Sequence, residues 1–266
     1  ATFAFLAVVI VPFLYGVYLT FTSWDGVSSN KPFVGLKNYA AVVADSSFWQ
    51  SLGLTLLYVV VSVILVNVIG FLLALLVTGK IKGKNFFRAG FFTPNLIGGI
   101  VLGYIWQLIF NGVLSRYGTA LALNEWYGFW GLIILVSWQQ IRYMMIIYIA
   151  GLQSIPGDVM EAAQIDGAGK WTKLFKVTIP MMMPSITICM FLSLTNGFKL
   201  FDQNLSLTAG EPSKMSEMMA LNIFNTFYGR TGWEGVGQAK AVLFFVLVVA
   251  ISMIQLHMTR SKEVQQ

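Results

Sequence analysis

Six long apolar stretches divide this chain, and each is close to the length of a helix that crosses a bilayer. They lie near residues 1–22, 52–79, 90–111, 129–151, 184–201 and 238–258. A helix needs ~20 predominantly apolar residues to cross the hydrocarbon core. The chain is 57% hydrophobic and only 11% charged, whereas soluble domains carry about 25% charged residues. We therefore expect an all-α integral membrane protein, with about six transmembrane helices forming one domain over residues 1–266.

Two of these stretches are less regular than the others. The third contains Pro94, followed by Gly99 and Gly103 at the spacing that lets two helices approach closely. The fifth is diluted by polar residues, namely Thr187, Ser193, Thr195, Asn196 and Lys199. The first is longer than the apolar part of a signal peptide and lacks a small-x-small cleavage site, so we expect a span there. Since residue 1 is Ala, we also expect further residues before it.

The distribution of charge predicts the orientation in the membrane. Basic residues gather in the segment 80–88, in the segment 152–184 and after residue 259. The alternate loops, 23–50, 112–128 and 202–237, hold most of the acidic residues and fewer bases for their length. Because short cytoplasmic loops carry an excess of Lys and Arg, we expect the basic segments and both termini in the cytoplasm. The net charge of +6 then reflects orientation and gives no reason to expect nucleic acid binding.

The segment 152–184 reads as a helix, a break and a second helix between the fourth and fifth apolar stretches. Pro156 suits the first turn of a helix, where its missing N–H costs nothing. Gly167 suits the break, because glycine adopts left-handed backbone conformations easily. Ala162 and Ala163 give the first helix a small-residue face that another surface can approach closely. The pattern indicates a docking element.

Motifs of several enzyme classes are absent from the sequence. It has no phosphate-binding G-x-x-x-x-G-K-[ST] loop, no H-E-x-x-H and no G-x-S-x-G. Its one histidine, His257, ends the sixth stretch, and its one cysteine, Cys189, excludes a disulfide framework. We expect no catalytic residue, metal or cofactor in this chain, so the energy for any pumping would have to come from a partner protein.

Several motifs together resemble one family. In segment 152–184 they are Glu161-Ala162-Ala163, Asp166-Gly167-Ala168, Phe175, and Ile179-Pro180 followed by Pro184. Supporting matches are Phe33-Val34-Gly35-Leu36-Lys37-Asn38-Tyr39, the run from Ala150 to Pro156, and Phe198-Lys199 with Phe201-Asp202. With these residues the chain resembles a permease subunit of a binding-protein-dependent ABC sugar importer, of the maltose "F", multiple-sugar or raffinose type.

This resemblance implies a type I ABC importer permease architecture in a bacterial inner or plasma membrane. It implies a heterodimer with a second permease, two cytoplasmic ATPase subunits that bind ATP and Mg, and an extracytoplasmic sugar-binding protein. The segment 152–184 would be the cytoplasmic coupling insert, the EAA loop of the family, seated on an ATPase. Its expected coupling residues are Glu161, Ala162, Ala163, Asp166, Gly167, Ala168, Phe175 and Pro180.

Sugar sites combine aromatic faces with amides and hydroxyls, because a sugar has apolar C–H faces and many hydrogen-bonding groups. Within the spans, the candidates are Asn67, Trp106, Gln107, Asn111, Trp138, Gln139, Tyr143, Asn196 and Phe198. The alternative for each is helix–helix hydrogen bonding or anchoring at the membrane interface. A further alternative is that the second permease holds most of the sugar contacts.

Three other functions are compatible with parts of the sequence. The same architecture could carry an amino acid, a metal or phosphate, although an anionic cargo would predict more bases within the spans than Arg142 and Lys199. A membrane-embedded enzyme acting on lipid-linked sugars would need a catalytic carboxylate or metal set, and Asp202 has no evident partner. A self-contained secondary transporter is disfavoured by the absence of visible inverted repeats and coupling acids.

Overall fold

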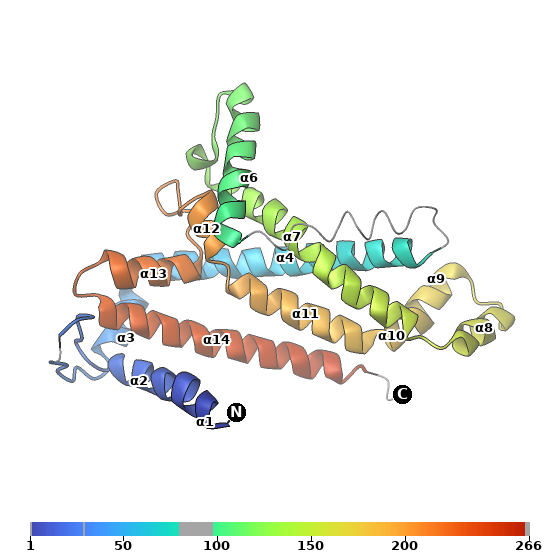
Figure 1. Ribbon diagram of the computed structural model, residues 1–266, viewed down its shortest axis with the longest axis horizontal. Helices are drawn as coiled ribbons and strands as arrows, with labels where there is room; N and C mark the ends of the chain where they lie inside the picture. Colours follow the sequence, from blue (N-terminus) through green and yellow to red (C-terminus); the bar gives the residue numbers. More distant parts are fainter. Residues whose placement is uncertain (1, 29, 80–97, 264–266) are drawn as a thin grey trace.

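The structure, a computed structural model, describes residues 2–28, 30–79 and 98–263. Within these ranges the regular elements are helices, apart from one isolated antiparallel bridge between Thr22 and Phe33. The predicted basic segment 80–88 and the start of the third predicted span lie outside the described residues. The longest helices run in roughly the same direction, with helices α3 (Lys37–Ala44) and α13 (Met219–Gly229) at one end and helices α8 to α10 (Gly157–Met181) at the other (Figure 1).

Four described helices are long and apolar enough to cross a membrane. They are the N-terminal helical stretch Thr2–Leu19, helix α4 over Ser46–Thr78, helix α7 over Glu125–Gln153 and helix α14 over Glu234–Arg260. The N-terminal stretch consists of α1 (Thr2–Phe5), a π-helical turn η1 (Leu6–Ile10) and α2 (Val11–Leu19). These helices lie at four of the six apolar stretches.

The other two stretches are shorter helices. Helix α11 covers Met183–Phe198 and meets the segment Lys170–Met181 at a bend of 70°, which gives at most a fifth span among the described residues. Helix α6 covers Gly99–Leu114, so it begins nine residues later than the stretch at 90, and residues 90–97 are not described. That six helices cross the membrane remains a prediction.

Helices α4 and α7 begin earlier than their apolar stretches because side-chain caps start them. The side chain of Asp45 accepts a hydrogen bond from the backbone N–H of Ser47, and Asn124 accepts one from Trp126. Such caps satisfy N–H groups of the first turn that have no partner within the helix. Hydrophobicity alone marks the part of a helix that lies in lipid, and it misses the capped turns beyond it.

The segments at the α13 end of the bundle are more helical than the sequence suggested. Helix α3 over Lys37–Ala44 lies in the loop expected at 23–50. Short helices α12 over Asp202–Leu207 and α13 over Met219–Gly229 occupy the loop expected at 202–237. The loop expected at 112–128 contains two short 3-10 turns, Ser115–Tyr117 and Leu121–Leu123. Asn38 donates hydrogen bonds of 2.8 Å to the carbonyls of Thr20 and Thr22, so α3 is fastened to the end of the N-terminal helix.

Helix α7 is the central helix of the bundle. Of its most apolar window, 56% is buried, whereas only 6% is buried in the corresponding windows of the N-terminal helix and of α14. It packs along α4 and also contacts α11, with Leu132, Leu135 and Met144 fully covered. The outer helices leave large apolar side chains exposed, which suits contact with lipid or with another subunit. A cavity inside the bundle would therefore be lined by α7.

Helices α6 and α12 approach each other closely through two glycines of α6. A Cβ added at Gly103 would lie 1.8 Å from Ser206 Oγ, and one added at Gly99 would lie 2.8 Å from Asp202 Cβ. The spacing of these glycines predicted a close helix contact, and the structure confirms it.

Substitution of Gly103 tests this contact. Gly103→Ala places a methyl group against Ser206, so we expect a loss of stability of about 1–3 kcal/mol, typical of overpacking. Gly112→Ala in the same helix is the matched control, because nothing lies within 4 Å of a Cβ there. It should be neutral or stabilise by up to ~1 kcal/mol through helix propensity. Thermal unfolding of the purified protein in detergent measures both, and equal effects would contradict the proposed contact.

Candidate functional site

A polar cavity of about 370 Å³ opens between α7, the end of α11 and the start of α12. Helix α7 contributes Val136, Gln139, Gln140 and Tyr143, and the α11–α12 junction contributes Asn196, Lys199, Leu200 and Gln203. The first set has the i, i+3, i+4, i+7 spacing of one helix face, and the second has the same spacing but continues across the break between α11 and α12. Mostly polar side chains thus face each other across a gap inside a bundle whose remaining surface is largely apolar.

The cavity offers amide, phenol and ammonium groups. Gln203 Nε2 donates a 3.0 Å hydrogen bond to Gln139 Oε1 across the cavity. Tyr143 is 48% exposed, and Asn196 and Lys199 are also exposed, so these side chains are available to a ligand. No carboxylate lies among the lining residues. This set can bind a polar molecule through many hydrogen bonds, and it offers no obvious acid–base pair for catalysis.

Three of the nine predicted sugar-binding residues, Gln139, Tyr143 and Asn196, line this cavity. Two more form an aromatic contact beside it: the rings of Trp106 and Trp138 lie 5.5 Å apart and meet edge to face. The guanidinium of Arg142 lies 5.0 Å from the Trp138 ring. Neither tryptophan is among the residues that line the cavity.

The structure places the other four candidates in contacts between elements of the fold. Asn67 on α4 donates to Ser193 on α11 at 2.8 Å and accepts from Tyr148 on α7 at 2.6 Å. Its amide therefore joins the three helices in the interior, as the alternative of helix–helix hydrogen bonding anticipated.

The remaining three candidates have similar roles. Gln107 donates to the carbonyl of Leu207 at 3.0 Å, which links α6 to α12. Asn111 accepts from the backbone N–H of Leu121 at 3.0 Å. Phe198 is 1% exposed and packs edge to face on Phe244. These side chains lie outside the cavity lining, so their expected sugar contacts have no support in the geometry.

Sequence reasoning missed Gln140, Lys199 and Gln203 as members of the site. A usable signal was present: Gln140 lies one turn before Tyr143, and Lys199 and Gln203 continue the face that begins at Asn196. Lys199 was noted in the fifth stretch and in a family motif, but it was not named as a sugar-binding candidate. The break between α11 and α12 concealed the periodicity of the second set.

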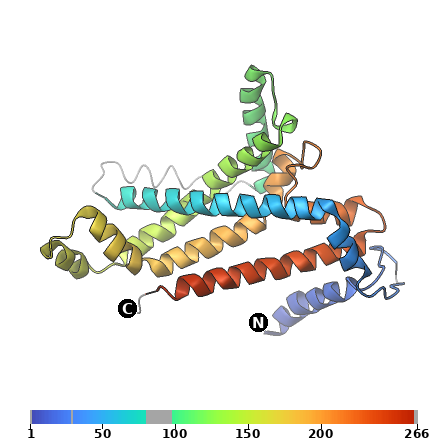
Figure 2. The same cartoon turned by 180° about the vertical axis from the view of Figure 1, so that it is seen from behind.

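A second candidate site is the elbow formed by α8–α10. Helix α8 covers Gly157–Ile165 and has no buried residue. Helix α9 (Lys170–Lys173), a π-helical turn η5 (Leu174–Thr178) and α10 (Ile179–Met181) lead back to α11. The elbow projects beyond the ends of the long helices in both views (Figures 1 and 2). It is therefore free to contact another molecule.

The turn of the elbow is fixed by backbone hydrogen bonds. Gly167 has a φ of +73°, a left-handed conformation that favours glycine. The N–H of Ala168 donates to the carbonyl of Ala163 at 3.0 Å, and the N–H of Gly167 donates to Gln164 at 3.1 Å. This is the Schellman arrangement that ends many helices. The predicted break at Gly167 is confirmed.

The predicted coupling residues lie along this elbow. Glu161, Ala162, Asp166 and Phe175 are exposed, and Ala163, Ala168 and Pro180 are partly buried. The sequence reasoning did not include three further exposed apolar side chains here, Val159, Ile165 and Trp171. The rings of Trp171 and Phe175 stack 6.0 Å apart at an angle of 17°. Exposed aromatic and apolar side chains of this kind are typical of a protein-binding surface.

The described residues contain no group of three or more His, Cys, Asp or Glu side chains that could hold a metal ion. The only histidine described, His257, lies near the end of α14. The chemistry of the described site is therefore hydrogen bonding in the cavity and surface contact at the elbow.

Comparison with known proteins identifies the family. The model of the inner membrane component of binding-protein-dependent transport systems matches residues 66–263. The chain belongs to this family. It is a translocation subunit with the type I importer permease fold, and it is not an enzyme.

Its relatives include several permeases. A probable starch degradation products transport permease of Thermoanaerobacterium thermosulfurigenes is 45% identical, over 98% of this chain and 91% of the relative. A multiple sugar-binding transport permease of Streptococcus mutans is 31% identical, over 95% and 90% of the two chains. A trehalose/maltose transport permease of Thermococcus litoralis is 32% identical, over 86% and 81%.

Solved structures share the fold at low sequence identity. A chain of a bacterial ABC transporter that imports the acidic polysaccharide alginate superposes with a TM-score of 0.82 at 19% identity, over 98% of this chain and 92% of the other. A chain of the methionine ABC transporter gives a TM-score of 0.57 at 16% identity, over 86% and 99%. The fold is therefore shared by permeases that serve different cargoes.

The different roles of Asn67 and Gln139 give a prediction. Asn67→Leu leaves Tyr148 and Ser193 without their shared partner, so we expect a loss of stability of about 1–2 kcal/mol. Gln139→Leu removes an amide whose partner, Gln203, also lines the open cavity and can bind water instead, so stability should change by less than ~0.5 kcal/mol. Thermal unfolding in detergent compares the two. The assignment of Asn67 to the fold would be wrong if Asn67→Leu unfolded like the unmodified permease.

Proposed function

We propose that this permease is one of two membrane subunits of an ATP-driven importer that carries an oligosaccharide. The single observation that carries the proposal is the polar cavity inside the bundle. Its amides and phenol suit the hydroxyl groups of a sugar, and no carboxylate lines it. The names of its relatives, which refer to starch degradation products, multiple sugars and trehalose or maltose, support the same cargo class.

The exposed elbow supports one of the proposed partners, the ATPase. The exposed faces of α8 and α9, with Trp171 and Phe175 stacked on the surface, suit a groove on a cytoplasmic ATPase subunit. A second, different permease subunit would cover part of the exposed apolar surface, and two ATPase subunits would bind ATP and Mg. An extracytoplasmic sugar-binding protein would deliver the cargo at the opposite end. In this orientation the elbow and both termini lie in the cytoplasm of a bacterial cell.

Transport would proceed by alternating access. Closure of the ATPase pair would push on the elbow, whose turn is fixed at Gly167 and whose second arm continues through Pro180 into α11. Helix α11 carries Asn196 and reaches the cavity directly. The displacement at the ATPase would therefore reach the face of the cavity that binds the sugar.

The cavity is tested by transport in proteoliposomes that contain the permease, its partner subunits and the binding protein. The double variant Gln139→Ala/Asn196→Ala removes two hydrogen-bonding groups worth about 1 kcal/mol each, so uptake of labelled maltooligosaccharide at low concentration should fall by about 10- to 50-fold. Basal ATP hydrolysis should stay unchanged, because the elbow is intact.

The control for the cavity is Gln50→Ala on α4, an exposed glutamine outside this cavity, which should leave uptake unchanged. Parallel assays with labelled amino acids and phosphate test the cargo class. Uptake of one of these in place of any sugar would refute the proposed cargo. Unchanged sugar uptake in the double variant would refute the proposed cavity.

The elbow is tested by Gly167→Pro. Proline fixes φ near −65°, which is incompatible with the φ of +73° at this position. We expect sugar-stimulated ATP hydrolysis to fall to near the basal rate while the permease still assembles in the membrane. Glu161→Lys, which reverses the charge on the exposed face of α8, should weaken co-purification of the ATPase.

The matched control is Gly157→Ala at the start of α8, where nothing lies within 4 Å of an added Cβ. It should retain stimulation. If both Gly167→Pro and Glu161→Lys kept full stimulation, the elbow would not be the coupling element.

A further inference from the structure

A buried lysine lies at the α13 end of the permease. Lys240, in the second turn of α14, has a fully buried side chain. Its Nζ atom donates to Asp45 Oδ2 at 2.7 Å, to Asn222 Oδ1 at 2.7 Å and to Thr226 Oγ1 at 2.8 Å. An ammonium has three donors, so every one of them has a partner.

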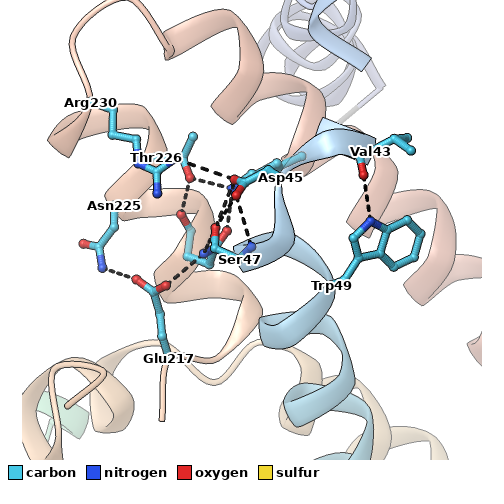
Figure 3. A network of polar contacts seen from close by, with 10 residues as sticks. Val43, Asp45, Ser47, Trp49, Glu217, Asn225, Thr226 and Arg230 are labelled. Carbon is cyan, nitrogen blue, oxygen red and sulfur yellow. Dashed lines mark hydrogen bonds and ion pairs between the residues drawn. The ribbon is translucent and has the colours of Figure 1, made fainter. Parts of the chain in front are cut away.

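The contacts continue into a second carboxylate. Glu217 is 1% exposed, and it accepts hydrogen bonds from Asn222 at 2.8 Å and from Asn225. Arg230 lies at the edge, 3.7 Å from Asp45 Oδ2, with 34% of its side chain exposed. Figure 3 shows Asp45, Glu217 and Arg230 as members of this polar network. We name Asp45, Glu217, Asn222, Thr226 and Lys240 the Lys240 cluster.

The Lys240 cluster joins three elements that are far apart in the sequence. Asp45 caps α4, Asn222 and Thr226 belong to α13, and Lys240 belongs to α14. The start of α13 is also fastened to α4, because the N–H of Met219 donates to Thr55 Oγ1 at 2.8 Å. One point therefore connects α13 to the ends of two long helices.

Packing alone does not explain why charges lie here. An apolar cluster that includes Val42, Phe48, Met219 and Val236 already brings the same elements together. Buried ion pairs cost desolvation, and apolar side chains of similar volume often stabilise a protein as well or better. Burial raises the pKa of the Asp45 carboxyl, but the hydrogen bonds from Lys240 and Ser47 lower the pKa by more. On balance the pKa of Asp45 is below its ordinary value. Asp45 therefore stays ionised and keeps its hydrogen bond from Lys240.

The segment just before α13 is held in one conformation. Asn204, which is fully buried, donates to the carbonyl of Ser216 and accepts from the N–H of Met218, both at 2.8 Å. Ser213 and Lys214 have left-handed φ values of 51° and 66°. Non-glycine residues keep such conformations only where the surroundings impose them. The segment 208–218 therefore has a fixed backbone conformation at this end of the permease.

We propose that Lys240 is a positioning residue that makes α13 and the segment 208–218 move as one body with α4 and α14. The inference rests on the proposed function, in which a binding protein engages this end of the permease. A partner that docks on the segment would then shift the ends of two long helices directly. Hydrogen bonds with defined directions resist sliding of α13 along α4, which a purely apolar contact does not.

The test uses the complete importer with its partner subunits and binding protein in nanodiscs. Lys240→Met alone would leave the Asp45 carboxylate without the buried ammonium that pairs with it, so the decisive variant is Asp45→Asn/Lys240→Met, which removes both charges at similar volume. We expect maximal stimulation of ATP hydrolysis by sugar-loaded binding protein to fall by about threefold or more. Basal hydrolysis and the half-saturating concentration of binding protein should stay unchanged, because the two substitutions change no residue of the elbow or of the segment 208–218.

A distance measurement separates this role from a purely stabilising one. Spin labels at Lys214→Cys on the segment and Val60→Cys on α4 report their relative position, since both residues are exposed. The native Cys189 is fully buried, so it should not react. With the cluster intact, the distance distribution should be narrow with and without ATP. In the double variant we expect a broad distribution at an unchanged unfolding temperature.

Two single variants complete the test. Arg230→Gln removes a nearby charge that makes no hydrogen bond in the cluster, so it should behave like the unmodified importer. Thr226→Val keeps the volume and removes one acceptor of Lys240, so it should show a smaller loss of the same kind, and it decides the question if the double variant fails to assemble. The proposal would be overturned if the double variant kept full stimulation and a narrow distance distribution. If the double variant does not assemble, the same result in Thr226→Val would overturn it. An unmodified importer that no sugar-loaded binding protein stimulates would count against the proposed function instead.

Discussion

The hydrocarbon core of a bilayer offers no partner to a backbone N–H or C=O group, and the rest of this structure depends on that constraint. Helices satisfy these groups internally, which explains why the elements described here are helices. Polar side chains within the bundle face the same constraint. Three of the places where they lie are the interhelical contact at Asn67, the cavity between α7 and α11, and the Lys240 cluster.

These three polar sites differ in how fully their hydrogen bonds are made. The polar groups of Asn67 and Lys240 make their hydrogen bonds to partners within the protein, which suits positions that hold helices in register. Gln139, Tyr143 and Asn196 face an open space of about 370 Å³ instead. A polar side chain in an apolar bundle is therefore informative for function when its hydrogen-bonding capacity is left for a ligand.

Helix α11 links the two functional regions of the permease. It begins at the bend of 70° beside the elbow and ends at the cavity, where Asn196 and Lys199 line one wall. In the proposed mechanism a displacement at the elbow would pass along α11 to the cavity, because a helix of 16 residues is short and stiff. At the opposite end, the Lys240 cluster gives α4 and α14 a similar rigid connection to α13. Both ends of the molecule are thus joined to the long helices by short, well-fixed elements.

The sequence alone determined the membrane-embedded helical fold, the family and the elbow, because hydrophobic length, Gly167 and the Glu161-Ala162-Ala163 motif are local signals. It placed Gly103 in a close helix contact for the same reason. It did not determine which polar side chains share a cavity, since Asn67 and Asn196 look alike in an apolar stretch and differ only in their neighbours. Nor did it reveal that Lys240 meets Asp45, a contact between residues 195 positions apart. Only tertiary packing decides whether a polar group in the bundle finds a partner, because its hydrogen bonds depend on helices brought together from distant parts of the chain.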